Sequence, residues 1–96
     1  SVYQPKRTDA NQAEIARGLR KLGLSVFSTH AIGRGFPDLV VFNPMSGCLM
    51  LLEVKSPCGR RTPGQKQFAA QFDGAVAVVR DVAEAACAVG IEALPW

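Results

Sequence analysis

The sequence predicts a single α/β domain with the element order αβββαβα. A helical repeat of apolar residues follows Asp9, two apolar strands flank the turn at 44–47, and a second helical segment precedes an apolar strand at 75–79. Because a helix separates the strand at 75–79 from the strand at 48–55, we expect these two strands to run parallel through a right-handed crossover. The prediction is therefore a mixed central sheet with helices on both faces.

The length of the chain allows one modest core, because 96 residues make one domain of ordinary size. Residues 1–8 are expected to form a loose basic arm, and residues 9–96 a single folded domain. No apolar run approaches the roughly 20 residues of a membrane span, and the N-terminal residues lack the apolar core of a secretory signal. Three widely spaced cysteines fit neither a disulfide framework nor a zinc site. We therefore expect a soluble, cytoplasmic protein with reduced cysteines and no membrane partner.

The first helix is predicted over residues 10–22. Asp9 can cap it together with Gln12, its apolar residues recur every three to four positions, and Gly23 ends it. One face of the helix should therefore pack against a sheet while the opposite face remains in solvent. The basic residues of the outer face are Arg17, Arg20 and Lys21.

Three strands are predicted next, at 24–29, 38–43 and 48–55. The residues between the first two form a loop at 30–36 that is rich in glycine. The second and third strands are apolar at nearly every position, so both faces of the sheet should be covered.

The last third of the chain begins with a basic loop at 56–61. Thr62 then caps a helix that has Pro63 in its first turn and Gln65 at the capping-box position. A final helix is expected to start at Asp81, after the strand at 75–79.

Positive charge is concentrated in the first two thirds of the chain. Residues 1–66 hold ten of the eleven Lys and Arg residues and four acids, a net charge of +6, whereas residues 67–96 carry −3. The basic part favours a polyanionic partner such as nucleic acid. A solvated basic surface would give the same composition.

The predicted hairpin brings two carboxylates and a lysine together. If the turn at 44–47 is symmetric, so that Asn43 faces Cys48, then Asp38 lies directly across from Glu53, with about 5 Å between their Cβ atoms. Lys55 shares the face of Glu53, because side chains alternate along a strand. The pairing depends on this turn geometry, because a slip by one residue would separate the carboxylates.

Two carboxylates opposite each other in an apolar sheet are destabilising unless a positive charge compensates them. Mg²⁺ or Mn²⁺ would do so through oxygen ligands, with coordination positions left open for phosphate. Such an ion can activate water and neutralise charge in phosphodiester hydrolysis, while Lys55 positions the water or stabilises the phosphate. The alternative is a salt bridge from Lys55 to Glu53 or Asp38, which leaves the second carboxylate without a partner.

Pro37–Asp38, followed after fourteen residues by Glu53–Val54–Lys55, resembles the signature of the PD-(D/E)XK nuclease superfamily. Gly35, the run at 52–57 and the run Thr62–Gln65 make the chain most similar to VRR-NUC domains, including the small stand-alone forms found in phages. If the gene is carried by a phage, the protein would act in the host cell.

The resemblance covers residues 9–90 and implies a restriction-endonuclease-like αβββαβ core. It also implies a role for each residue of the site. The implied metal ligands are Asp38, Glu53, the backbone carbonyl of Val54 and, through water, Glu14; Lys55 and Gln65 complete the catalytic set.

Glu14 and Gln65 also have structural alternatives. Glu14 could pair with Arg17 on the surface of its helix. Gln65 could serve only as the capping-box partner of Thr62. It lies on the same helix face as Phe68, however, and a polar side chain that faces the sheet is costly unless it has a partner. The residues predicted to contact DNA flank the site: Arg34, Arg60, Arg61 and Lys66.

Together, these residues and the resemblance predict a divalent-metal-dependent endodeoxyribonuclease without an organic cofactor. The resemblance points to branched substrates such as four-way (Holliday) junctions, and cutting two symmetric strands would require a homodimer. One alternative is a non-catalytic nucleic-acid-binding module that retains the fold. Another is a metal-dependent hydrolase of a small phosphorylated substrate.

Overall fold

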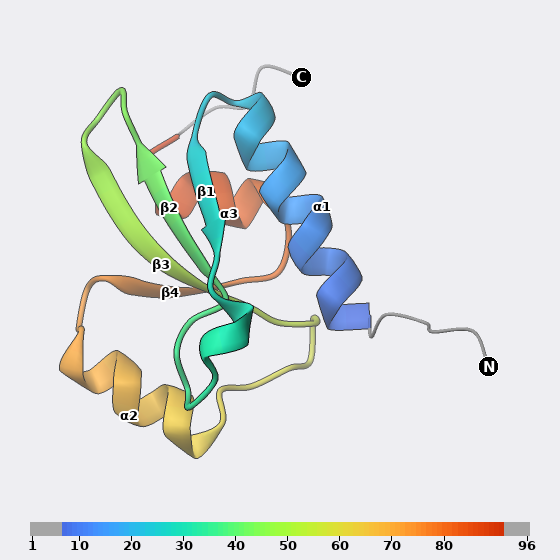
Figure 1. Ribbon diagram of the computed structural model, residues 1–96, viewed down its shortest axis with the longest axis vertical. Coiled ribbons are helices and arrows are strands. Elements are labelled where there is room, and N and C mark those ends of the chain that lie inside the picture. Colours follow the sequence, from blue (N-terminus) through green and yellow to red (C-terminus); the bar gives the residue numbers. More distant parts are fainter. Residues whose placement is uncertain (1–6, 92–96) are drawn as a thin grey trace.

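The computed structural model describes residues 7–91, which form one four-stranded mixed sheet with helices packed around it (Figure 1). This arrangement confirms the predicted α/β fold and the predicted order of the elements. The elements are α1 (Arg7–Lys21), β1 (Ser25–Ser28), the 3₁₀ helix η1 (His30–Ile32), β2 (Leu39–Asn43), β3 (Cys48–Val54), α2 (Pro63–Gln71), β4 (Val76–Val79) and α3 (Val82–Ala88).

Helix α1 begins at Arg7, three residues before the predicted start. Asp9 therefore lies inside the helix and not at its cap, and the remainder of the predicted arm, residues 1–6, lies outside the described residues. The segment from Arg7 to Arg17 contains neither glycine nor proline, so nothing in it stops the helix from extending towards the N-terminus. The C-terminal end is as predicted. Gly23 has a φ of +88°, and the N–H of Leu24 donates to the carbonyl of Leu19 in a Schellman-type cap.

The strands lie in the order β1-β2-β3-β4. Strand β2 is antiparallel to β1 and to β3, whereas β4 is parallel to β3, so the predicted crossover through α2 is confirmed. Asn43 faces Cys48, which is the register assumed for the symmetric turn. The β2–β3 ladder ends at the pair Leu39–Leu52, one pair short of Asp38 and Glu53.

The core lies between one face of the sheet and the helices α1 and α3, which Figure 1 shows on the same side of the strands. Helix α1 can approach α3 closely because it carries Gly18, where an added Cβ would lie 2.8 Å from the methyl groups of Val82. The fully buried apolar side chains of this core include Ile15, Leu19, Leu39, Val41, Leu52, Val54, Val79 and Val89.

The opposite face of the sheet is covered only in part. At its hairpin end, Phe42 and Leu49 are 38% and 57% exposed, and on the edge strand β1 Phe27, which faces Val40, is 72% exposed. Helix α2 lies towards the other end of the strands (Figure 1), where Phe68 packs edge-on against Phe36 with 5.0 Å between the ring centroids. The expectation that both faces are fully covered is therefore wrong for the hairpin end. None of the helices within residues 7–91 is long and apolar enough to cross a membrane.

Candidate active site

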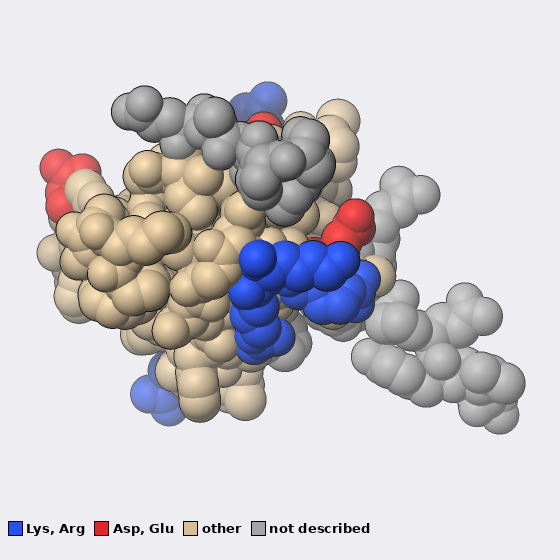
Figure 2. Space-filling view, turned by 90° about the horizontal axis from the view of Figure 1, so that it is seen from above, with Lys and Arg blue, Asp and Glu red and all other residues tan. Residues whose placement is uncertain are grey.

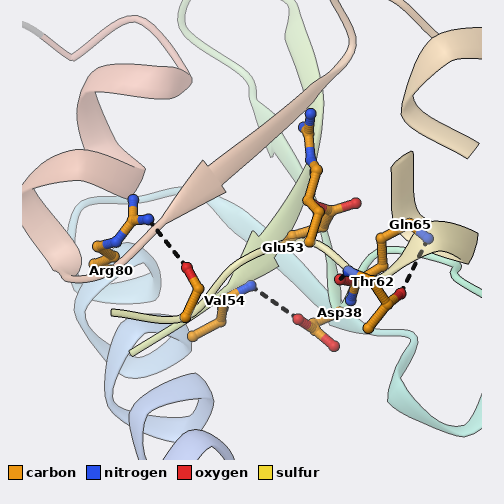
Figure 3. A network of polar contacts seen from close by, with 8 residues as sticks. Asp38, Glu53, Val54, Thr62, Gln65 and Arg80 are labelled. Carbon is orange, nitrogen blue, oxygen red and sulfur yellow. Dashed lines mark hydrogen bonds and ion pairs between the residues drawn. The ribbon is translucent and has the colours of Figure 1, made fainter. Parts of the chain in front are cut away.

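Asp38 is held in place by three hydrogen bonds to the backbone of neighbouring strands and loops. Its N–H donates to the carbonyl of Leu52 over 2.9 Å, and its carbonyl accepts from the N–H of Thr29 over 2.9 Å. Its carboxylate oxygen Oδ2 accepts from the N–H of Val54 over 2.8 Å, as Figure 3 shows. The position of the carboxylate is thus fixed by the sheet, which is the preorganisation that a metal ligand needs.

The predicted pairing of Asp38 with Glu53 is replaced by a different local geometry. If the β2–β3 ladder continued, the N–H of Val54 would face Pro37, which has no N–H to complete the pair. The Pro37 carbonyl instead accepts from the hydroxyl of Thr29, and the carboxylate of Asp38 takes the N–H of Val54. Asp38 and Glu53 therefore lie at adjoining ends of β2 and β3 as predicted, but they do not form a ladder pair.

Glu53 is fully buried, with 0% of its surface exposed. Its Oε2 accepts from Nε of Arg61 over 2.7 Å, in an ion pair whose basic side chain is 29% exposed. Its Oε1 is buried and has no hydrogen-bond partner among the described residues. Because a buried carboxylate is costly unless its oxygens are paired, Oε1 marks a position where a further cation or donor belongs.

The donor set fits a hard divalent cation. Among the side chains that the structure describes, which exclude those of residues 7–9 and 30 within the range 7–91, there is no cluster of three or more His, Cys, Asp and Glu that could hold a metal. An ion at this site would depend on Glu53, on the second oxygen of Asp38, on a backbone carbonyl such as that of Val54, and on water. Oxygen ligands with several waters suit Mg²⁺ or Mn²⁺ and do not suit zinc.

Lys55 follows directly on the last residue of β3. Its N–H donates to the carbonyl of Val79 over 3.0 Å, so the backbone pairing with β4 continues through it. Across the described residues, the ion pair between Arg61 and Glu53 is the one salt bridge formed. The alternative in which Lys55 neutralises Glu53 or Asp38 is therefore not what the structure shows, and the side chain of this half-buried residue is available for another role.

Gln65 forms the capping box of α2. Its Oε1 accepts from the N–H of Thr62 over 2.9 Å, and its own N–H donates to the Thr62 hydroxyl over 3.2 Å (Figure 3). Gln65 is therefore the capping-box partner of Thr62, and this role uses only the oxygen of its side-chain amide. The amide nitrogen of Gln65 has no hydrogen bond within the described part of the chain.

Gly35 brings the loop before Asp38 onto the first turn of α2. A Cβ on Gly35 would lie 2.5 Å from the carbonyl of Gly64, and its φ of +77° also favours glycine. The close approach thus requires a glycine at position 35, whereas a Cβ on Gly64 would meet nothing closer than 3.7 Å. It also positions Gln65 relative to the loop that ends at Asp38.

Glu14 lies on α1 away from these groups. It is exposed and lines a groove between α1 and α3 with Arg17, Gly18, Lys21 and Val82. None of the other predicted site residues lines that groove. Glu14 also forms no ion pair with Arg17.

Two residues that the sequence interpretation missed lie near the site. Gln12 is 8% exposed and lines a groove of about 330 Å³ with Ser28 and Leu39, the neighbour of Asp38. Arg80 donates from Nε to the carbonyl of Pro57 and from Nη2 to that of Gly59, both over 3.3 Å, and so holds the loop that follows Lys55. The predicted parallel pairing could have identified Arg80, because it places the ends of β3 and β4 side by side.

The residues predicted to contact DNA differ in their settings. Arg34 is exposed in a left-handed conformation with a φ of +56°, which is uncommon outside glycine. Arg60 is exposed on the loop held by Arg80, and Lys66 is exposed on α2. Arg61 differs from these three, because its guanidinium group is turned inward to Glu53.

A second basic group lies on the C-terminal half of α1. Figure 2 looks onto this end of the molecule and shows Lys and Arg side chains gathered beside a region without charge. The group comprises the exposed residues Arg17, Arg20 and Lys21. Arg20 also donates to the carbonyl of Val26 over 2.9 Å, which occupies a hydrogen-bonding position on β1.

Comparison with known proteins agrees with this geometry. The sequence profile of the VRR-NUC domain matches residues 3–89. A solved structure described as a VRR-NUC domain superposes with a TM-score of 0.69 at 26% sequence identity, covering 82% of this chain and 89% of that one. No curated protein is significantly similar in sequence. Because the profile spans most of the chain and the superposition spans most of both chains, the protein belongs to the VRR-NUC domain family of nuclease-related proteins.

Proposed function

We propose that the protein is a divalent-metal-dependent endodeoxyribonuclease. The observation that carries the proposal is the buried Oε1 of Glu53, which has no hydrogen-bond partner in the described part of the chain and lies at the end of β3 where Asp38 is fixed by Val54. A binding module without catalysis has no need for an unpaired carboxylate oxygen inside an apolar sheet, because such an atom is costly to bury.

Each residue of the site has a distinct task in this proposal. Asp38, Glu53 and the carbonyl of Val54 would hold Mg²⁺ or Mn²⁺, which would supply charge neutralisation and a more acidic water. Lys55 orients the attacking water or stabilises the charge that develops on the phosphate. The free amide nitrogen of Gln65 can donate to a phosphate oxygen while its oxygen keeps the helix cap.

The α1 side of the site is assigned to Gln12 instead of Glu14. Gln12 is nearly buried and shares a groove with Leu39, next to Asp38 in the chain. Glu14 remains the residue that the family resemblance implies, although its groove faces α3. Cleavage by Gln12→Ala and Glu14→Gln distinguishes the two residues.

The proposed substrate is DNA, held through its phosphates by Arg34, Arg60 and Lys66. All three side chains are exposed, and they come from the loop before β2, the loop after β3 and helix α2. A four-way junction is the form of DNA that the family resemblance suggests.

We further propose a homodimer that buries the uncovered face of the sheet. The exposed parts of Phe27 and Phe42 present about 220 Å² of residue surface, taking about 200 Å² for a fully exposed Phe. A standard interface buries about 800 Å² per partner, so the two rings would form its centre and Leu49 with the β2–β3 turn would extend it. A second copy is the occupant that supplies a second active site for symmetric cleavage of a junction.

The test is cleavage of labelled four-way, flap, single-stranded and linear duplex DNA in Mg²⁺, in Mn²⁺ and in EDTA. We expect cleavage with either metal and none in EDTA, with the four-way junction cut fastest. The matched variant Asp38→Asn should bind the junction without cutting it. Absence of cleavage of every substrate in both metals would overturn the enzyme proposal and favour the binding module.

A further inference from the structure

The ion pair between Arg61 and Glu53 lies on the carboxylate that the proposed metal would need: Arg61 bonds Oε2, and Oε1, which has no partner among the described residues, is the neighbouring oxygen. Glu53 has no exposed surface, and Arg61 is the basic side chain that lies against its carboxylate. A divalent cation that binds Glu53 would therefore be placed next to a guanidinium group of the same sign. Like charges in a poorly solvated position repel strongly, so the two cations cannot both be held there at low cost.

The contact that Arg61 makes is suited to being broken. Among the described residues, its guanidinium group bonds to Glu53 through Nε alone, whereas a strong arginine–carboxylate pair uses two parallel hydrogen bonds. The side chain is 29% exposed, so it has a path to solvent. Arg61 also belongs to the loop between β3 and α2. Arg80 attaches this loop to the fold through hydrogen bonds to the carbonyls of Pro57 and Gly59.

We infer that Arg61 is the counter-ion of Glu53 in the metal-free protein and that divalent metal displaces it. Arg61 and metal then compete for Glu53, and the displaced guanidinium group turns outward beside Arg60, where it can contact a DNA phosphate. Metal binding thereby converts Arg61 from a partner of the protein into a partner of the substrate. This inference rests on the proposed metal site and adds to it a regulated DNA contact.

The inference is tested by titrating Mn²⁺ into protein without DNA, followed by isothermal titration calorimetry. Arg61→Gln should bind Mn²⁺ about tenfold more tightly than the wild type, which is an ordinary strength of coupling between competing ligands. Arg60→Gln is the matched control, because it removes the same charge from the neighbouring position, where the side chain is exposed and does not contact Glu53. The inference requires the gain in Arg61→Gln to exceed that in Arg60→Gln.

A second measurement uses the wild-type protein and does not depend on the folding of a variant. The Nε–H resonance of Arg61 should be resolved in the NMR spectrum of the metal-free protein, because the group is hydrogen-bonded to a buried carboxylate. Addition of Mg²⁺ should move it to the position and fast solvent exchange of a free arginine.

The outcomes separate the inference from the function on which it rests. Equal Mn²⁺ affinity in Arg61→Gln and Arg60→Gln, or an Arg61 resonance that Mg²⁺ leaves unchanged while metal binds, would overturn the displacement and leave the metal site standing. Absence of any Mn²⁺ binding at millimolar concentration to wild type and variants would overturn both.

Discussion

The carboxylate of Asp38 accepts the N–H of Val54 over 2.8 Å, where the ladder between β2 and β3 has ended at Leu39 and Leu52. The carboxylate of Asp38 thus accepts the N–H of Val54, which would face the backbone of Pro37 if the ladder continued. The hydrogen bond fixes one oxygen of Asp38 and leaves the other available. It also ties the position of this carboxylate to β3, the strand that carries Glu53.

Asp38→Asn should separate the chemistry of this residue from its structural role. The amide oxygen can still accept from Val54, so we expect the melting temperature to stay within a few degrees of the wild type. Loss of the negative charge should lower cleavage by more than about a hundredfold, since even indirect partners of a metal ligand contribute 10- to 100-fold. Cleavage at the wild-type rate would show that Asp38 does not bind the metal.

Asp38→Ala provides the comparison for stability. It leaves the buried N–H of Val54 without an acceptor, which should lower the free energy of unfolding by about 1–3 kcal/mol. Urea denaturation of the two Asp38 variants measures this difference. Equal stability of the Ala and Asn variants would mean that the hydrogen bond to Val54 contributes little.

Lys55→Ala should abolish cleavage and leave the fold intact. Lys55 makes no ion pair among the described residues, so its removal should change the free energy of unfolding by less than about 0.5 kcal/mol. A group that positions water or stabilises phosphate typically contributes 10²- to 10⁴-fold to the rate, and we expect a loss of about that size in single-turnover cleavage. A large drop in melting temperature together with the loss of cleavage would indicate a structural role instead.

The fold could be predicted from the sequence where local chemistry determines it. The turn at 44–47 set the pairing of Asn43 with Cys48, because a short loop between two apolar strands allows few registers. The parallel pairing of β4 with β3 followed from the helix that separates the two strands, because parallel neighbours need such a crossover connection. The capping box of Thr62 and Gln65 could also be predicted, because it depends on residues three positions apart.

The details of the site could not be predicted in the same way. The symmetric register placed Asp38 opposite Glu53, but Pro37 cannot complete the next ladder pair and the Asp38 carboxylate bonds to Val54 instead. The inward orientation of Arg61 depends on side-chain torsions and on the path of a glycine-containing loop, neither of which has a periodic signal in the sequence. The uncovered face around Phe42 reflects where α2 packs, which apolar strand composition does not specify.

Glu14→Gln and Gln12→Ala should separate the two residues of α1. Glu14 is exposed in the groove against α3, so its replacement should change cleavage by less than about threefold and the free energy of unfolding by less than about 0.5 kcal/mol. Gln12→Ala should reduce cleavage more than Glu14→Gln does, because Gln12 is nearly buried beside Leu39. A loss in Glu14→Gln comparable to that in Asp38→Asn would restore the role implied by the family resemblance.

The close contact between Gly35 and Gly64 predicts opposite effects for two alanine substitutions. Gly35→Ala would place a Cβ 2.5 Å from the backbone of Gly64 at a φ of +77°, so it should lower the free energy of unfolding by more than about 1 kcal/mol. Gly64→Ala meets nothing closer than 3.7 Å and lies in the first turn of α2, so it should raise stability by about 0.4–1 kcal/mol. Urea denaturation measures both, and a destabilising Gly64→Ala would contradict the geometry of this contact.

Leu49→Lys should convert the proposed dimer into a monomer. Leu49 is 57% exposed on the uncovered face of the sheet, and a lysine in an apolar interface would be buried without a partner in the complex. Ala83→Lys on the exposed surface of α3, which packs on the opposite face of the sheet, adds the same charge away from that face and serves as the control. Sedimentation velocity at micromolar concentration should give a dimer for the wild type and the control and a monomer for Leu49→Lys. The Leu49→Lys monomer should still nick one strand of a four-way junction but should lose paired cleavage of two strands. A wild-type monomer that cuts both strands of the junction, or a dimer that Leu49→Lys leaves intact, would exclude this face as the interface.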